Sequence, residues 1–131
     1  MSDFAYALAR TMLAVVFIVS GVAKFMNVTG TADTLAAHGF LFPTVFGYAT
    51  AALEVAGGCC VMIGYRARWA ALVLLVFTAG TVAVSHHFWD MEGLERVRNQ
   101  TQALKNLAIM GGLLLIAIGG AGRFSLDRVR G

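Results

Sequence analysis

Residues 69–85 read WAALVLLVFTAGTVAVS and contain no charged side chain. This length approaches the roughly 20 apolar residues that an α-helix needs to cross the hydrocarbon core of a bilayer. Arg66 and Arg68 stand immediately before the stretch, and basic residues are common at the ends of membrane helices. We therefore predict a transmembrane helix at about residues 67–86.

Three more apolar stretches occupy most of the remaining chain. They predict transmembrane helices at about residues 4–25, 44–64 and 104–121. Pro43 precedes the second stretch, and proline is favoured in the first turn of a helix. The connection to the helix at 67–86 is so short that these two helices must be antiparallel neighbours. The predicted fold class is an all-α membrane protein, a bundle of four transmembrane helices.

The composition excludes an ordinary water-soluble domain. Hydrophobic residues make up 59% of the chain, charged residues 13%, and the mean hydropathy is +0.76. Soluble domains are about 45–50% apolar and about 25% charged. The net charge of +3 comes from basic residues scattered at the ends of apolar segments, which argues against a nucleic-acid partner. We expect residues 1–131 to form a single domain in contact with the lipid bilayer.

Two connections have distinct compositions. Residues 29–42 mix apolar side chains with Asp33 and His38, which predicts a short interfacial helix or re-entrant segment between the first two spanning helices. Gly39 is expected to end that helix. Residues 86–103 are the most polar part of the chain, and we expect them to form a loop.

Basic residues in the short connections predict the orientation, because Lys and Arg favour the cytoplasmic side. Arg96 and Arg98 lie on the opposite side and oppose this assignment, although acidic residues surround them. With four spans, we predict that both termini are cytoplasmic. The residues that favour this orientation are Arg66, Arg68, Arg123, Arg128 and Arg130.

Glu54 is the single charge in the helix predicted at 44–64 and stands near its middle. A carboxylate at this depth costs several kcal/mol unless it is protonated or paired, so it usually faces the bundle interior. At 1.5 Å per residue, Glu54 lies at about the same depth as the polar residues at the outer ends of the other three helices. Long lysine side chains there can reach Glu54, or can extend outward to the headgroups instead. These polar residues are Lys24, His86, Lys105 and Asn106.

Other polar residues favour structural roles. Arg10 lies about two turns into the first helix and can pair with Asp127 of the tail or extend toward the headgroups. His86 and His87 are adjacent, so on a helix their side chains point about 100° apart. Because His38 lies on a separate connection, we expect no metal site.

The chain contains no motif that identifies a reaction. It has no CxxC, no phosphate-binding glycine-rich loop and no nucleophile motif. Cys59 and Cys60 are adjacent, and a disulfide between them would need distorted geometry. We interpret both cysteines as small buried apolar residues.

Several short motifs follow one another along nearly the whole chain. In this order they resemble the DoxX family of small four-helix bacterial inner-membrane proteins, which implies a bacterial inner-membrane location. The motifs are Arg10 with FIVSG at 17–21 and Lys24, Pro43, Glu54 with Gly57 and Gly58, Gly64, HHFW at 86–89, KNLA at 105–108, Gly111 with Gly112, and Gly120, Gly122, Ser125, Leu126 and Asp127.

The resemblance implies a membrane subunit of a quinone- or thiol-linked redox system. Members of that family are associated with thiosulfate:quinone oxidoreduction and with membrane oxidoreductase complexes. A quinone would then be the ligand and an oxidoreductase the partner, while catalysis by the subunit itself stays open. Glu54 and His86 would exchange protons, and Lys24, Lys105 and Asn106 would hydrogen-bond the quinone head group.

Two other functions fit the same residues. The first is a small transporter or a proton or ion pathway with Glu54 as its site; four short helices would need a homo-oligomer for alternating access. The second is a non-catalytic scaffold. In that case the polar segment 90–102 docks a partner protein, and Glu54 forms a structural pair with a lysine.

Overall fold

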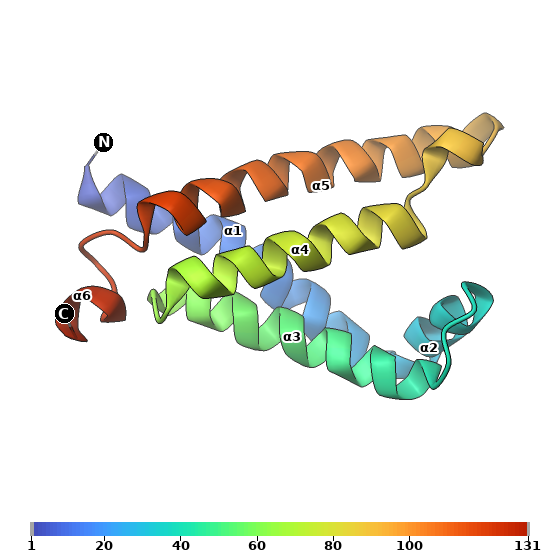
Figure 1. Cartoon of the computed structure of the whole chain (residues 1–131), viewed down its shortest axis with the longest axis horizontal. Helices are drawn as coiled ribbons and strands as arrows, with labels where there is room; N and C mark the ends of the chain where they lie inside the picture. Colours follow the sequence, from blue (N-terminus) through green and yellow to red (C-terminus); the bar gives the residue numbers. More distant parts are fainter. Residues whose placement is uncertain (1, 131) are drawn as a thin grey trace.

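The computed structural model describes residues 2–130, and these residues form helices joined by turns (Figure 1). Four helices are long and apolar enough to cross a membrane, which confirms the predicted all-α membrane bundle. They are α1 (Asp3–Met26), α3 (Pro43–Ile63), α4 (Ala67–Ser85) and α5 (Gly93–Gly119). The shorter elements are α2 (Val28–Ala37), the 3-10 helix η1 (Phe88–Asp90) and α6 (Leu126–Arg130).

The ends of α1 and α3 follow from local sequence. The Ser2 hydroxyl accepts a hydrogen bond from the Ala5 N–H at 3.2 Å and so caps the start of α1. Pro43 begins α3, as predicted. Gly64 follows the helix with φ at 70°, a left-handed conformation that glycine adopts without steric cost.

The four long helices associate in pairs. α1 packs chiefly against α3, and α4 packs chiefly against α5. α3 and α4 also contact each other and are joined by the short turn at residues 64–66, so they are the antiparallel neighbours that the sequence predicts. Figure 1 shows the two pairs close together at the end with this turn and further apart toward α2 and η1.

The core consists of small and aliphatic side chains together with Phe17. Its largest fully buried side chains are Val61, Leu74 and Leu113. Many large apolar side chains on the outer faces are exposed, which fits a surface that contacts lipid. On α1 the buried positions recur every three or four residues, as one face of a helix does. They are Arg10, Ala14, Phe17 and Gly21.

α1 and α3 approach each other closely at glycines. A Cβ atom on Gly21 would stand 2.8 Å from the backbone oxygen of Ala51 and 2.7 Å from Cγ2 of Val55. A Cβ atom on Gly58 would stand 2.9 Å from Cγ1 of Ile18. Neither position has room for a side chain. Small residues allow membrane helices to pack at short distance, and here they bring the middle of α3 against α1.

The connections agree only partly with the prediction. α2 is the short helix expected within residues 29–42, and Gly39 follows it with φ at 80°. The last spanning helix, however, begins at Gly93 and not near residue 104, so most of the expected loop at 86–103 is helical. Residues 92–98 are all exposed, as the polarity of this segment indicates. An exposed polar segment can nevertheless be helical.

Candidate functional site

An ion pair with a buried carboxylate joins α1 to α3. Glu54 is only 5% exposed, and its Oε2 atom lies 2.7 Å from Nζ of Lys24. The Ser20 hydroxyl lies 3.2 Å from both carboxylate oxygens and donates to that group, and it accepts a hydrogen bond from Lys24 Nζ at 2.8 Å. The structure therefore turns Lys24 inward, toward Glu54, and not outward to the headgroups. A buried carboxylate needs such a partner.

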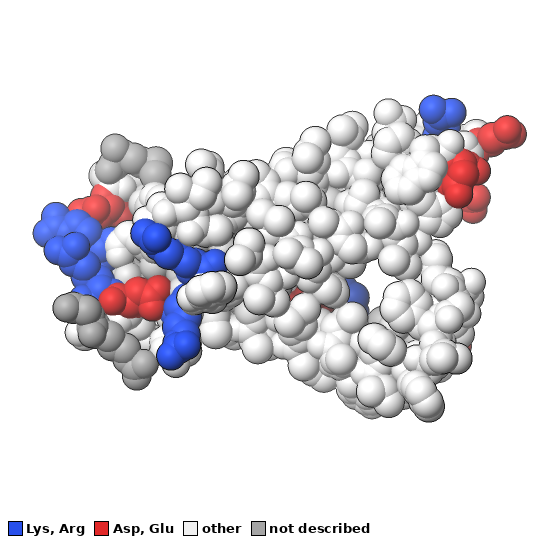
Figure 2. Space-filling view, viewed as in Figure 1, with Lys and Arg blue, Asp and Glu red and all other residues white. Residues whose placement is uncertain are grey.

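A cavity of about 500 Å³ lies beside this ion pair. It is bounded by α1, α2, α3 and α4, and Figure 2 shows a hollow on this face with charged side chains visible inside it. Leu35 and Phe77 contribute apolar walls. A cavity that combines apolar walls with hydrogen-bonding groups suits an amphipathic ligand. The polar lining residues are Ser20, Lys24, Asn27, Thr31, Thr34, Thr50, Thr81 and Ser85.

Glu54 also borders a smaller cavity of about 80 Å³. Asn106 of α5 lines this cavity, so the structure brings Asn106 to the same space as Glu54. Ser20 and Thr81 line both the smaller and the larger cavity and therefore stand between them. The smaller cavity is polar enough and large enough to hold water beside the carboxylate.

The other two residues predicted for this cluster lie elsewhere. Nδ1 of His86 is 3.0 Å from Oδ1 of Asn99, a contact that links the end of α4 to α5. Lys105 is exposed and forms no hydrogen bond or ion pair with the described part of the chain. Neither residue lines either cavity. The helical start of α5 explains this result for His86, because it supplies Asn99 as a nearby partner.

The remaining histidines and the cysteines lie outside the cavities. Nδ1 of His87 is 2.6 Å from Oδ1 of Asp90, and its ring centroid is 6.0 Å from that of His38. Within residues 2–130, no three His, Cys, Asp or Glu side chains gather into a group that could hold a metal ion. Cys59 and Cys60 are free thiols, and the prediction that both are buried is wrong, since α3 turns Cys59 outward.

Arg10 and Asp127 tie the C-terminal tail to the opposite end of the bundle. Arg10 is 4% exposed; its Nη1 donates to the Ala121 carbonyl and its Nη2 donates to the Phe124 carbonyl at 2.7 Å. The Asp127 carboxylate accepts hydrogen bonds from the backbone N–H groups of Arg66, just before α4, and Ala67, its first residue, at 2.6 and 2.9 Å. Each residue thus makes a structural contact, although the two do not form the direct ion pair that the sequence left open.

Arg10→Met should release the tail, because it leaves two carbonyl groups without their charged donor. Hydrogen bonds to charged groups contribute about 1.5–3 kcal/mol each, so we expect trypsin to cleave after Arg123 at least about tenfold faster than in the wild type. Timed digestion followed by mass spectrometry measures this rate. Arg98→Gln, an exposed change on α5, should leave the rate unaltered, and equal rates in the two variants would contradict the role of Arg10.

Comparison with known proteins decides the family. The sequence pattern of the DoxX family matches residues 5–87, which include Lys24 and Glu54. The chain belongs to the DoxX family. The SURF4 family pattern also matches, over residues 47–130. The two matches overlap on α3 and α4, so these helices carry features common to both families.

Two bacterial relatives cover almost the whole chain. Inner membrane protein YphA of Escherichia coli (strain K12) is 34% identical over 121 residues, which is 92% of this chain and 86% of YphA. Inner membrane protein YqjF of the same organism is 33% identical over 132 residues, covering 98% of this chain and 94% of YqjF. This DoxX-family protein is therefore an integral inner-membrane protein.

A more distant relative is eukaryotic. The ER-derived vesicles protein ERV29 of Saccharomyces cerevisiae is 33% identical over 79 residues, which is 60% of this chain but 25% of ERV29. No solved structure matches the chain significantly.

Sequence reasoning missed Ser20 and the threonines of the larger cavity. Ser20 and Lys24 are four residues apart and share one helix face, which was the signal available for Ser20. Thr31, Thr34 and Thr50 gave no comparable signal. They reach the cavity only because α2 folds back against α3, and that contact is not apparent in the sequence.

Proposed function

We propose that this protein is the membrane subunit of a quinone-linked redox system and that its 500 Å³ cavity binds the quinone head group. The observation that carries the proposal is the Ser20–Lys24–Glu54 cluster, in which Ser20 and Lys24 line that cavity and Glu54 is buried behind them. A charged pair inside a membrane bundle is costly, and such groups commonly mark a ligand or proton site.

The donor capacity of Lys24 favours a carbonyl ligand. An ammonium group has three N–H donors. Two of them are used by Ser20 and Glu54, at 2.8 and 2.7 Å, and the Lys24 side chain is still 28% exposed. The third donor is therefore available to a quinone oxygen in the cavity. The hydroxyl groups of the four lining threonines already donate to backbone carbonyls, so they can accept from the O–H groups of a quinol but cannot donate to a quinone. Phe77 offers an apolar face to the quinone ring.

The balance of the reaction defines what the partner must supply. Reduction of a quinone to a quinol takes up two electrons and two protons. A partner oxidoreductase would deliver the electrons, since the proposal gives this chain only binding and proton exchange. Lys24 would hold a proton next to one quinone oxygen, and Glu54 would stabilise that ammonium group between transfers. His86 and Lys105 have no part in this proposal, because neither lines the cavity.

The packing below the cluster favours binding over permeation. Between the level of Glu54 and that of Arg10, the bundle is filled by apolar side chains that are fully buried. A transporter or an ion pathway needs a polar route through this layer, and the tight contacts at Gly58 leave α1 and α3 little room to separate. The residues of this layer are Ala14, Val61, Leu74 and Leu113.

Glu54→Gln should lower the amount of quinone that co-purifies with the protein. The change removes the charge that holds Lys24 in place but keeps the size of the side chain. Loss of a charge-assisted contact of about 1.4 kcal/mol or more predicts at least about a tenfold lower ratio of quinone to protein. The ratio is measured by extracting protein in native-lipid nanodiscs and separating the quinones by chromatography.

Asp33→Asn is the matched control, since Asp33 is an exposed carboxylate on α2. It should retain the wild-type ratio. A wild-type protein without quinone, or equal ratios in both variants, would contradict the proposal. If Glu54→Gln mainly lowers stability, and scrambling the exposed start of α5 abolishes function, the result supports the scaffold function.

A further inference from the structure

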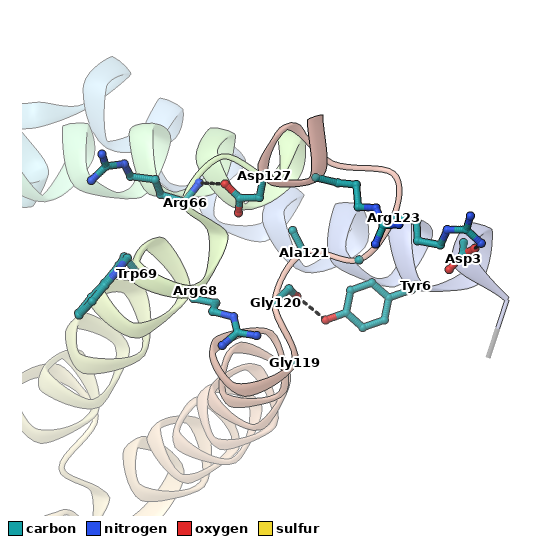
Figure 3. A pocket seen from close by; sticks show the side chains of 12 residues that line it. Asp3, Tyr6, Arg66, Arg68, Trp69, Gly119, Gly120, Ala121, Arg123 and Asp127 are labelled. Atoms are coloured by element: carbon teal, nitrogen blue, oxygen red, sulfur yellow. Dashed lines mark hydrogen bonds and ion pairs between the residues drawn. The ribbon is translucent and has the colours of Figure 1, made fainter. Parts of the chain in front are cut away.

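A second large cavity lies at the opposite end of the bundle, far from Glu54. Its volume is about 620 Å³, and it is formed by the start of α1, the turn between α3 and α4, and the segment that follows α5 (Figure 3). The Tyr6 hydroxyl, on α1, donates a hydrogen bond at 2.6 Å to the carbonyl of Gly120, in the segment that follows α5. Figure 2 shows basic side chains gathered at this end.

The cavity has more cationic than anionic groups available. Arg68 and Arg128 line it and form no hydrogen bond or ion pair with the described residues. Nη1 of Arg123 lies 3.4 Å from Oδ2 of Asp3, and the Arg123 and Asp3 side chains are 69% and 43% exposed. The other acidic residue, Asp127, is already held by the backbone N–H groups of α4. The unpaired charge in the cavity is therefore positive.

Arg68 is the cation most clearly directed into this cavity. Its Nε atom lies 3.2 Å from where a Cβ atom on Gly120 would stand, so the side chain packs against the turn after α5. Figure 3 shows the guanidinium group of Arg68 beside Gly119 and Gly120, whereas the side chain of Arg66 points away from them.

The surroundings of the cavity fit a membrane–water boundary. The ends of three spanning helices meet here: the starts of α1 and α4 and the end of α5. Trp69 lines the cavity and is 68% exposed, and Phe124, the residue after the lining residue Arg123, is 62% exposed. Exposed aromatic rings next to arginines are typical of the headgroup level of a bilayer.

We propose that this cavity binds the phosphate group of an anionic phospholipid. Guanidinium groups form paired hydrogen bonds to phosphate oxygens, and Arg68, Arg123 and Arg128 supply three such groups around one space. Basic pockets between spanning helices suit lipid headgroups, and each arginine near an anionic surface strengthens binding about fivefold. A lipid bound in this way would lie close to Trp69, which lines the same cavity.

Fluorescence quenching of Trp69 tests the proposal. The full chain with Trp89→Phe, which leaves Trp69 as the only tryptophan, is reconstituted in phosphatidylcholine vesicles. A minor share of the lipid is brominated phosphatidylglycerol or, in the parallel sample, brominated phosphatidylcholine. We expect the brominated anionic lipid to quench Trp69 several-fold more effectively. Equal quenching by the two lipids would overturn the proposal.

Matched variants locate the binding site. Arg68→Gln with Arg123→Gln should weaken binding of the anionic lipid by about 25-fold, which is two factors of about five, and so bring the quenching by the two lipids close to equality. Arg98→Gln removes one positive charge about 30 Å away along α5, at 1.5 Å per residue, and should preserve the selectivity. Circular dichroism spectra verify that each variant is folded. Selectivity that survives in the double variant would contradict this site.

Added inorganic phosphate separates the two sources of a phosphate group. A lipid anchored by its acyl chains should remain bound when inorganic phosphate is present in excess over lipid. If inorganic phosphate abolishes the selective quenching, the cavity is a site for a free anion and the lipid assignment is wrong. Selectivity that persists in phosphate supports the lipid.

Discussion

Lys24→Met should lower the free energy of unfolding by about 3 kcal/mol, because it leaves the Glu54 carboxylate buried without its ammonium partner. The Ser20 hydroxyl alone cannot compensate a full charge. Protonation of Glu54 would relieve part of this cost, since a neutral carboxyl group is easier to bury than a charged one. Reversible unfolding in mixed micelles measures the difference.

The control for this prediction is another lysine in the same chain. Lys105→Met changes an exposed side chain without a described partner and should alter the free energy by less than about 0.5 kcal/mol. The double variant Lys24→Met with Glu54→Leu should recover about 2 kcal/mol, because both charges are then removed together. Equal losses in Lys24→Met and Lys105→Met would show that the ion pair contributes little.

Gly21→Leu should destabilise the fold at least as much as Lys24→Met, because it disrupts the contact between α1 and α3. Even a Cβ atom at Gly21 would stand 2.8 Å from the Ala51 carbonyl oxygen, and backbone atoms cannot move aside as a flexible side chain can. Overpacking of this kind costs about 1–3 kcal/mol, and a whole leucine side chain should exceed that range or prevent folding. The measured quantities are the folded yield and the midpoint of thermal unfolding.

Gly111→Leu is the matched control for this substitution. Gly111 also lies within a spanning helix, but nothing stands within 4 Å of a Cβ atom there. We expect a folded yield and an unfolding midpoint close to those of the wild type. If Gly111→Leu and Gly21→Leu unfold alike, the damage comes from leucine in a membrane helix and not from close packing of α1 on α3.

The spanning helices and Glu54 were predictable because each depends on one simple physical rule. A long uncharged stretch such as residues 69–85 has few stable arrangements other than a membrane helix. A lone carboxylate in such a stretch must find a partner. Depth along the helices gave four candidates at the level of Glu54, and the structure pairs one of them, Lys24, with the carboxylate.

The lateral arrangement was harder to predict, since depth does not say which residues at one level face each other. Lys24 and Asn106 face the space near Glu54, whereas His86 contacts Asn99 and Lys105 is exposed. Helix rotation decides between these outcomes, and close contacts such as the one at Gly21 set that rotation.

The start of α5 was misassigned for a different reason. Its first turns are polar, and a polar segment between two apolar stretches predicts a loop. The structure shows that the segment is an exposed helix instead. Because the helix continues upstream, it places Asn99 against His86, which removes His86 from the predicted proton site.

Photolabelling with an azidoquinone tests the central claim most directly. The purified protein in nanodiscs is irradiated with the azidoquinone, and the labelled peptides are mapped by mass spectrometry. We predict labels on α2 and on the end of α1 around Lys24. An excess of unmodified quinone should displace this labelling, and the labelling should be much weaker in Glu54→Gln. Labels spread over the outer faces of the helices, or labels that unmodified quinone does not displace, would contradict a quinone site in this cavity.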